Sequence, residues 1–427
     1  MKVLAVFPAY PGAHYDGSAI YARMLLAALR RKGVEIDVLA TRSERPDPVG
    51  AFDLRWPNEL PRRERKGGTT IRRYDTLHLP GIGALASTSV PRRWGREAAL
   101  RGEVVDGSRA LVQEQVRRAW NRPARFDAMA GLGRGPFAPG LAAHVLRHAG
   151  RYDVVLIGYS PFLLPTLARR AARRRGRPVV LLPFIHEGDP YHHFRYLYRD
   201  YQAADAVLTL STHTVGSLAD HLPEVKAAAL GAGVTVPKGT RPADGRRFRA
   251  QHGLGDARVL LFVGRKEAGK NYRMAVDALE HLPGDVRLVL VGLDVDRVPL
   301  HDPRAVHLGL LSDEELADAY AAADVFALPS RNESFGMVFL DAWSHGVPVI
   351  GHARCGASAA LIDDGVDGFL CRDVPDLSER IGLLLADPGR AAAMGDAGAR
   401  KVREVYTWDR VAERALATFR SVAPEAR

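Results

Sequence analysis

Short apolar runs alternate with amphipathic segments along most of this chain of 427 residues. A buried-type strand at Lys2–Pro8, a Gly/Pro-rich loop, a helix at Ser18–Arg31 and a strand at Val34–Ala40 open the series. Strands that alternate with helices form parallel sheets covered by helices on both faces, so this pattern predicts an α/β fold. The alternation resumes with strands Val154–Gly158, Val179–Ile185 and Ala206–Leu210 and helices Phe162–Arg174, Tyr191–Ala203 and Thr214–His221.

A second series follows Pro237–Arg249, a stretch rich in Pro, Gly and Arg that we interpret as a linker. Two series joined by one linker predict two doubly wound, Rossmann-like domains that face each other across a cleft. The strands predicted in this series are Val259–Val263, Val286–Val291, Val306–Leu308, Val325–Leu328 and Pro348–Gly351, and the helices are Asn271–Leu282, Asp313–Ala323, Phe335–His345 and Leu377–Ala386.

The domain boundaries follow from this division. We assign residues 1–236 to an N-terminal domain and residues 237–407 to a C-terminal domain. Residues 408–427 contain a long amphipathic helix, Trp408–Val422, which we expect to pack back on the N-terminal domain. The stretch 42–136 is divergent: residues 42–68 indicate a mobile loop, and only a strand near Thr70–Leu77 and a helix around Gly107–Ala119 are predicted beyond it.

Composition excludes several classes of protein. Apolar runs such as Val154–Ile157 stay far below the roughly 18 residues that a membrane-spanning helix needs. The apolar run after Met1-Lys2 is too short for the core of a signal peptide. Cys355 and Cys371 have no CxxC partner, which argues against a disulfide framework or a thiolate metal site. We therefore expect a cytoplasmic location.

Basic charge is concentrated in the first half of the chain. Residues 1–236 carry a net charge of +14, whereas residues 237–427 carry −3. This excess is compatible with an acidic acceptor, an anionic membrane surface or nucleic acid. A coding bias toward Arg explains the excess as well, because 52 of the 60 basic residues are Arg. Such charged residues usually lie on solvated surfaces. Nucleic acid is disfavoured because no recognised binding motif accompanies the charge.

The most informative stretch is the end of the predicted strand Val325–Leu328 and the helix after it. Glu333 lies at the carboxyl end of this strand, where open α/β sheets bind their ligands. The free N–H groups of Phe335, Gly336, Met337 and Val338 would suit a diphosphate, and Gly336 lets a ligand approach the backbone closely. Asp341, further along the helix, could accept hydrogen bonds from a diol such as ribose. The alternative is a strand–helix turn with a capping acid.

A second cluster follows the strand Val259–Val263. Gly264 ends the strand, and Arg265 and Lys270 lie in the loop and at the start of the next predicted helix. Cations are unfavourable at a helix N-terminus, so an anion between them would explain their presence. The alternative is two exposed surface cations.

Together these segments resemble the family 4 glycosyltransferases of the GT-B fold. The resemblance covers most of residues 258–372 and is weaker in the first half, where Gly17, His186-Glu187 and Ala232-Gly233-Val234 match. The matching motifs in the second half are Val263-Gly264-Arg265…Lys270, Leu290-Val291-Gly292, Leu311-Ser312-Asp313-Glu314-Glu315-Leu316, Tyr320-Ala321-Ala322-Ala323-Asp324-Val325, Glu333-Ser334-Phe335-Gly336, Gly356 and Asp364-Gly365…Asp367-Gly368-Phe369.

The resemblance implies a retaining transferase that takes a sugar from a nucleoside diphosphate without a metal. Arg265 and Lys270 would hold the diphosphate and stabilise the leaving group, and Glu333 would bind hydroxyl groups of the donor sugar. Asp341 would meet the ribose, although the family normally has Glu there, and His186 would lie near the transferred sugar. The expected catalytic residues are thus Glu333, His186, Arg265 and Lys270, and the expected donor-binding residues are Gly17, Gly264, Arg265, Lys270, Leu311, Glu333, Phe335, Gly336, Met337, Val338 and Asp341.

Three other signals carry less weight. Asp294-Val295-Asp296 has the form of a metal-binding DxD, but we interpret it as a solvated turn because this fold places no metal there. The glycine-rich stretch Gly131–Gly135 follows no clear strand, so it fails the context of a dinucleotide fingerprint. His192-His193 lacks a helical partner, which leaves zinc unsupported. We expect neither a metal nor another cofactor.

The leading hypothesis is a glycosyltransferase that uses a nucleotide sugar as donor. The acceptor could be a carbohydrate, a lipid-linked molecule or a small natural product, and the basic first half is compatible with peripheral contact to a membrane. A rival enzyme class is the GT-B-like sugar-nucleotide epimerase, which needs no acceptor. A rival of a different class is a protein that binds sugar nucleotides but has lost activity, with Asp341 as the residue in doubt.

Overall fold

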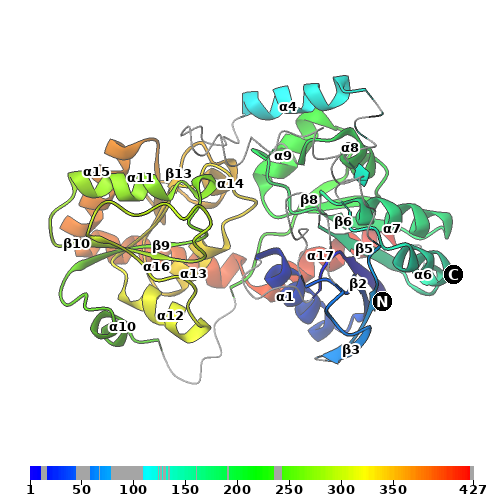
Figure 1. The fold of residues 1–427 in the computed structure, drawn as a ribbon, viewed down its shortest axis with the longest axis horizontal. Helices are drawn as coiled ribbons and strands as arrows, with labels where there is room; N and C mark the ends of the chain where they lie inside the picture. Colours follow the sequence, from blue (N-terminus) through cyan, green and yellow to red (C-terminus); the bar gives the residue numbers. More distant parts are fainter. Residues whose placement is uncertain are drawn as a thin grey trace. The chain divides into compact units, whose positions relative to one another are not determined.

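Two β-sheets with helices on their faces organise this computed structural model of the chain (Figure 1). The structure describes residues 1–10, 17–44, 58–66, 68–77, 109–123, 125, 127, 131–132, 135–159, 161–189, 192–234 and 243–423. The described residues divide into two compact units, and each is treated by itself below. Unit 1 takes its residues from Met1–Arg92, Arg109–Gly231 and Trp408–Arg427, and unit 2 from Ala232–Thr407. The predicted α/β fold is confirmed.

The sheet of unit 1 has the strand order β3-β4-β2-β1-β5-β6-β7-β8. Every neighbouring pair is parallel except β3 and β4, which form an antiparallel edge. Because the chain moves outward from β1 to β2 and later returns to β5 on the other side of β1, its direction reverses there. The strands are β1 (Lys2–Phe7), β2 (Glu35–Thr41), β3 (Arg63–Lys66), β4 (Thr69–Tyr74), β5 (Val154–Gly158), β6 (Val179–Leu182), β7 (Ala206–Thr209) and β8 (Ala227–Ala229).

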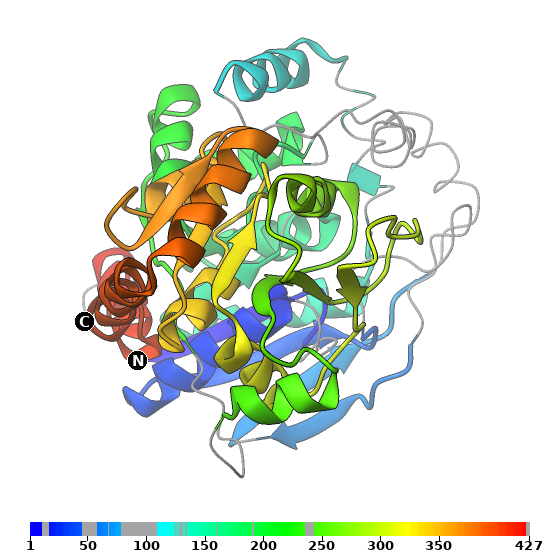
Figure 2. The same ribbon diagram turned by 90° about the vertical axis from the view of Figure 1, so that its left-hand side faces the viewer.

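Helices cover both faces of this sheet, which explains why all five residues of β5 are apolar and buried. α6 and α7 pack together over one face, and α1 packs on α17 (Figure 2 shows the blue α1 beside the red α17). The ring of Trp408 on α17 lies 5.1 Å from that of Tyr21 on α1. The helices are α1 (Gly17–Arg31), α4 (Arg109–Asn121), α6 (Pro139–His148), α7 (Leu163–Arg174), α8 (Arg195–Gln202), α9 (Thr212–His221) and α17 (Trp408–Val422), with a short 3-10 helix at Ala149–Arg151.

The sheet of unit 2 has the order β11-β10-β9-β12-β13-β14, and all its neighbouring strands are parallel. Its chain direction reverses between β9 and β12, because the chain runs outward from β9 to β10 and β11 before it returns to β12. The carboxyl ends of all six strands therefore lie at one edge of the sheet. The strands are β9 (Arg258–Val263), β10 (Val286–Val291), β11 (Ala305–His307), β12 (Val325–Leu328), β13 (Val349–His352) and β14 (Gly368–Cys371).

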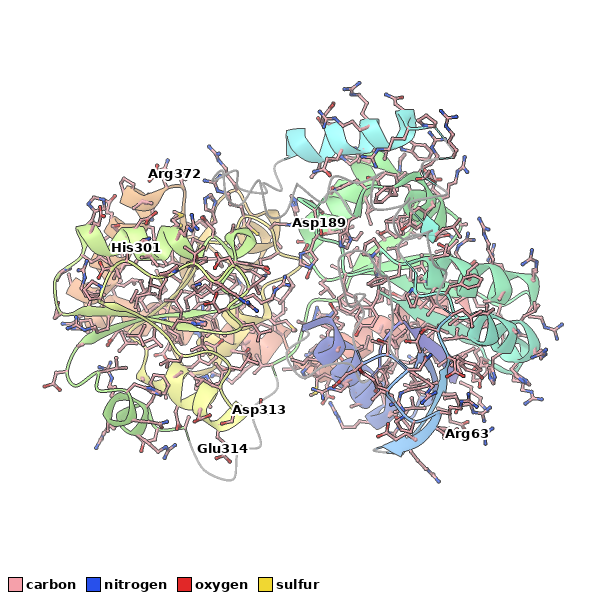
Figure 3. All side chains as sticks on the ribbon, viewed as in Figure 1. Arg63, Asp189, His301, Asp313, Glu314 and Arg372 are labelled. Carbon is pink, nitrogen blue, oxygen red and sulfur yellow. The ribbon has the colours of Figure 1, made fainter. Side chains whose placement is uncertain are left out.

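Helices also cover both faces of the second sheet, with α11 and α15 on one face and α12 and α13 on the other (Figure 1). Ser312 caps α12 in a capping box with Glu315, and the labelled Asp313 and Glu314 add acids to this first turn (Figure 3). The helices are α10 (Gly245–Gln251), α11 (Tyr272–Asp277), α12 (Asp313–Ala322), α13 (Met337–Ser344), α14 (Gly356–Leu361), α15 (Val374–Ala386) and α16 (Pro388–Val405), with 3-10 turns at Ala268–Lys270 and Ala278–His281.

Two segments differ from the sequence-based predictions. The predicted loop 42–68 contains the edge strand β3, whose Glu64 accepts a 2.6 Å bond from the buried Arg73. The end of the predicted linker is the helix α10, capped by Asp244. Two of its arginines form ion pairs, Arg247 with Asp318 at 2.6 Å and Arg249 with Asp324 at 3.0 Å. Parts of the predicted loop before α1, of 42–57, of the 107–119 helix, of Gly131–Gly135 and of the linker lie outside the described residues.

Two predictions drawn from composition concern membrane-spanning helices and the two cysteines. Within the described ranges, none of the helices combines the length and the apolar character that crossing a membrane requires. Cys355 and Cys371 are both free and buried, and burial raises the pKa of the Cys371 thiol to about 12.

Candidate functional site

Lys270 and Glu333, predicted from two separate clusters, bind each other at the reversal point of the second sheet. Lys270 ends the turn after β9, and Glu333 lies in the loop after the neighbouring strand β12. The Lys270 Nζ donates to both carboxylate oxygens of Glu333, at 2.7 and 2.8 Å. Their side chains are 17% and 7% exposed. Open α/β sheets bind ligands at such a point, so the pair marks the candidate site.

The loops that carry this pair are joined to each other. Asn271 adopts a left-handed conformation with φ of 53° and ends the turn Ala268–Lys270. Its side-chain amide donates to the carbonyl of Pro329 at the end of β12, at 3.0 Å. The Ser330 hydroxyl donates to the Gly269 carbonyl at 3.3 Å. These bonds set the direction from which Lys270 approaches Glu333.

The loop after β9 also lies against the loop after β10. Gly292 has φ of 140°, and a Cβ atom there would lie 2.1 Å from the Gly264 carbonyl oxygen. Only glycine allows this approach. Arg265 follows Gly264 and is 58% exposed, with Glu267 as its partner at 2.8 Å. Because an exposed ion pair contributes little free energy, Arg265 is available to an anion at this edge.

The start of α13 supplies backbone donors to the same edge. The helix begins at Met337, two residues later than predicted, and Gly336 is its N-cap with φ of 91°. The first N–H groups of a helix, here those of Met337 and Val338, have no partner within the helix. Phe335 is only 3% exposed, and its ring packs edge-on against Tyr406 at 5.6 Å. Phe335 thus anchors the start of the helix with its side chain.

Asp341 lies one turn into α13 and is partly buried. Burial raises the pKa of its carboxyl group to about 7. The Asp341 backbone carbonyl accepts bonds from Ser344 Oγ at 2.7 Å and from the His345 ring at 2.8 Å. The His345 ring stacks on Tyr320, whose pKa burial and the neighbouring Asp341 raise. Leu311, the remaining predicted donor contact, is partly exposed just before α12.

The DxD segment is a turn in which Asp294 and Val295 are exposed, as predicted, but its two acids also bind a buried lysine. Asp294 and Asp296 both accept hydrogen bonds from the Nζ of Lys266, at 2.7 and 2.9 Å. Lys266 is 2% exposed and was not predicted as a functional residue. The sequence did contain a signal for it. Lys266 follows the predicted strand that is now β9, and Asp294 and Asp296 follow the next predicted strand, now β10. The turn is therefore partly solvated and also neutralises a buried cation.

The predicted residues of unit 1 lie at the carboxyl edge of its sheet. Gly17 is the first residue of α1, and His186 follows β6, with its ring 5.7 Å from that of His192. The adjacent Glu187 is buried and pairs with His213 at 2.9 Å. His193 uses one ring nitrogen with Tyr198 and the other with the Glu187 carbonyl, both at 2.6 Å, and burial lowers its pKa.

A small pocket lies beside this loop of unit 1, with Glu187, His193 and Tyr198 in its lining. In the part of the chain that the structure describes, no group of three or more His, Cys, Asp or Glu side chains is arranged to hold a metal ion.

Comparison with known proteins gives three kinds of match. Residues 257–387 match the family described as "Glycosyl transferases group 1". The GDP-mannose-dependent alpha-(1-6)-phosphatidylinositol monomannoside mannosyltransferase of Mycolicibacterium smegmatis is 32% identical over 362 residues, which are 74% of this chain and 92% of that protein. A D-inositol 3-phosphate glycosyltransferase of Xylanimonas cellulosilytica is 37% identical over 185 residues, but the match spans only 38% of this chain and 42% of that protein.

Two solved structures match over nearly the whole length. HepE from Anabaena, in complex with UDP and glucose, has a TM-score of 0.69 at 18% identity and covers 99% of this chain and 100% of that one. Sucrose-phosphate synthase from Thermosynechococcus elongatus has a TM-score of 0.65 at 20% identity, with 99% of each chain covered. At this identity the likeness concerns the fold.

Proposed function

Because this chain belongs to the group 1, family 4 glycosyltransferases and has the GT-B fold, we propose that it transfers a sugar from a nucleoside diphosphate to a hydroxyl group of an acceptor. The observation that carries the proposal is the Lys270–Glu333 pair at the reversal point between β9 and β12. A nucleotide sugar offers both groups a new partner, since its phosphates attract Lys270 and its sugar hydroxyls donate to Glu333.

The donor is proposed to bind unit 2 along the edge formed by these loops. Its diphosphate would contact Arg265, Lys270 and the N–H groups at the start of α13, which together supply positive charge. Gly264 and Gly336 leave the backbone accessible there. Asp341 is proposed to accept hydrogen bonds from the ribose, with Leu311 beside the nucleoside. The exchange of partners keeps the buried charges of Lys270 and Glu333 compensated.

The reaction is proposed to retain the configuration of the sugar and to need no metal. Negative charge grows on the leaving diphosphate in the transition state, and Arg265 and Lys270 stabilise it there. The acceptor hydroxyl then attacks from the face that the diphosphate leaves, which retains the configuration. In unit 1, His186 is the candidate catalytic residue and Gly17 a candidate for phosphate contact.

Two relatives suggest which acceptors to test first. Their names specify inositol 3-phosphate and phosphatidylinositol monomannoside, so we propose an acceptor that carries a phosphorylated polyol. We place the reaction in the cytoplasm. With a lipid-linked acceptor, the net charge of +14 on residues 1–236 would favour contact with an anionic membrane surface.

Incubation of the protein with UDP- and GDP-sugars, first alone and then with each acceptor, tests the proposal. We expect a glycosylated acceptor whose anomeric configuration, read by proton NMR, equals that of the donor, and we expect EDTA to leave the rate unchanged. If the donor alone yields an epimerised sugar, the protein is instead a sugar-nucleotide epimerase. If the donor binds without turnover, the protein is an inactive sugar-nucleotide-binding protein. An inverted product contradicts retention. Activity that is lost with EDTA and restored by Mg²⁺ or Mn²⁺ contradicts metal independence.

A further inference from the structure

Lys266 is a buried cation inside a cluster that the proposed chemistry does not use. Its Nζ bonds Asp294 and Asp296 and lies 5.2 Å from the centre of the Tyr272 ring. The Tyr272 hydroxyl in turn donates to the second oxygen of Asp296, at 2.7 Å. Burial alone would lower the pKa of Lys266, but its bonds to the two acids outweigh burial and raise this pKa above its ordinary value. The ammonium group therefore stays charged between its two carboxylates.

This cluster, which we name the Lys266 clamp (Lys266, Asp294, Asp296 and Tyr272), ties the loop after β9 to the loop after β10. The Lys266 N–H donates to the Leu293 carbonyl at 2.8 Å, and its carbonyl accepts from the Val295 N–H at 3.1 Å. Lys266 also directly follows Arg265, and the turn that ends in Lys270 begins two residues later. The clamp thus fixes the base of the segment that carries both phosphate-binding candidates.

A second lysine in unit 2 has the same chemistry at the opposite edge of the same sheet. Lys401 bonds Asp363 and Asp367, at 2.8 and 2.6 Å, and lies 5.3 Å from the centre of the Trp343 ring. Asp367 directly precedes β14, whereas Lys266 and Asp294 follow β9 and β10. Because all six strands are parallel, the two clusters lie at opposite edges of the sheet. A lysine held by two acids is therefore a structural device in this unit, and only the Lys266 clamp lies at the ligand edge.

We propose that Lys266 and Asp294 are positioning residues that hold the Gly264–Lys270 segment where Arg265 and Lys270 meet the donor diphosphate. This inference rests on the proposed function, since it assigns a task within the same donor site. The clamp acts through the backbone and contacts neither the donor nor the acceptor. Loosening it should weaken recognition of the diphosphate and leave recognition of the nucleoside intact.

Asp294→Asn, compared with Asp363→Asn, is the decisive test. Each substitution keeps the shape of the side chain and removes one of the two acids that hold a lysine, and both acids are partly exposed, at 38% and 67%. Removing a negative charge beside a phosphate site would by itself tighten diphosphate binding. Weaker binding by Asp294→Asn can therefore come only from lost positioning.

The measurement is the Kd of UDP or GDP, whichever the wild type binds more tightly, and of the matching monophosphate, by calorimetry. We expect Asp294→Asn to raise the Kd of the diphosphate about three- to tenfold, or about 0.7–1.4 kcal/mol, and that of the monophosphate less than twofold. Asp363→Asn should change neither by more than twofold. Lys266→Met and Lys401→Met form a second matched pair, in which both lower the unfolding midpoint and only Lys266→Met lowers the preference for the diphosphate.

The outcomes separate the two proposals. If the wild type binds the diphosphate but Asp294→Asn and Asp363→Asn behave alike, the positioning role is wrong and the proposed function stands. If the wild type binds neither nucleotide, the proposed function falls, and the positioning role falls with it.

Discussion

Lys270 and Glu333 neutralise each other, so each depends on the other before any donor arrives. Lys270→Met would remove the ammonium group that bonds both oxygens of the Glu333 carboxylate, which is 7% exposed. We expect the free energy of unfolding to fall by about 2 kcal/mol, because a mostly buried carboxylate loses its charged hydrogen bonds to Lys270. We also expect turnover to fall more than about tenfold, because the leaving group loses its cation in the transition state. Chemical denaturation and initial rates at saturating donor measure the two effects.

The double variant Lys270→Met with Glu333→Gln separates these effects. It removes both charges, so stability should recover most of the loss while turnover stays low. Recovery of turnover together with stability would show that the pair only holds the loops together. Unchanged turnover in Lys270→Met would remove Lys270 from the catalytic residues.

The Asp341 carboxyl predicts a pH dependence of donor binding. Its pKa is raised to about 7, so the fraction that can accept two hydrogen bonds from ribose falls below that pH. We expect the Kd of the donor to rise about five- to tenfold between pH 8 and pH 6. Asp341→Asn is the control, because it has no carboxyl group that titrates at this position. Any titration of the donor itself affects both proteins equally. The same slope in wild type and Asp341→Asn would contradict the assignment.

The sign of the stability effect follows from the same shift. The folded-state pKa lies above the ordinary value of 3.8, so the folded protein holds this proton more tightly than the unfolded chain. The carboxyl group therefore costs no stability below about pH 4, and its cost grows until about pH 7. Asp341→Asn should raise the free energy of unfolding at pH 8 and leave it nearly unchanged at pH 4.

The helix α13 has a left-handed glycine at each end, and only one of them faces the proposed donor. Gly336 has φ of 91°, and a Cβ atom there would lie 2.7 Å from the Phe339 ring, whereas Gly346 has φ of 73° and open space around it. Gly346→Ala should cost about 1 kcal/mol of stability through backbone strain alone. Gly336→Ala should cost more because of the added contact, and it alone should weaken nucleotide diphosphate binding. Equal effects of the two variants on binding would remove the helix N-terminus from the site.

Strands such as β5, β6 and β12 were predictable because each is a short, buried apolar run, as buried parallel strands require. α16 was missed because its buried face combines a few apolar residues, such as Met394 and Val402, with two glycines. A Cβ at Gly395 would lie 1.9 Å from the Gly346 carbonyl oxygen, and one at Gly398 would lie 2.0 Å from the Trp343 ring. Hydrophobic periodicity cannot reveal such a close approach of two helices. β3 was missed because the charged sequence of an edge strand resembles that of a loop.

Gly264, Lys270 and Glu333 were predictable as site residues because each lies in the loop that follows a predicted strand. The direct bond between Lys270 and Glu333 was not, because it depends on the order of β9 and β12 in the sheet. Lys266 was missed for the same reason. Its two acids follow β10, and only the pairing of β9 with β10 brings them to it.

Each unit contains a buried tryptophan whose loss should be felt in that unit. Trp408 of α17 is 5% exposed and packs on Tyr21 of α1, whose hydroxyl donates to the Gly231 carbonyl at 2.7 Å. Trp343 of α13 is fully buried, and its ring N–H donates to the Asp367 carbonyl at 2.7 Å. Since truncating a buried tryptophan costs about 3–5 kcal/mol, each change to Ala should lower the stability of its own unit by that order.

Hydrogen exchange followed by mass spectrometry assigns the loss of protection to each unit. We expect Trp408→Ala to speed exchange in α1 and β7, which α17 contacts, and in the neighbouring strand β1 of the same unit. Trp343→Ala should speed exchange in β9, β12 and β13. In the wild type, a bound nucleotide diphosphate should slow exchange in these strands of unit 2 and not in unit 1. Faster exchange of β9 in Trp408→Ala, with β1 unchanged, would show that α17 stabilises unit 2 and that its contacts with α1 contribute little.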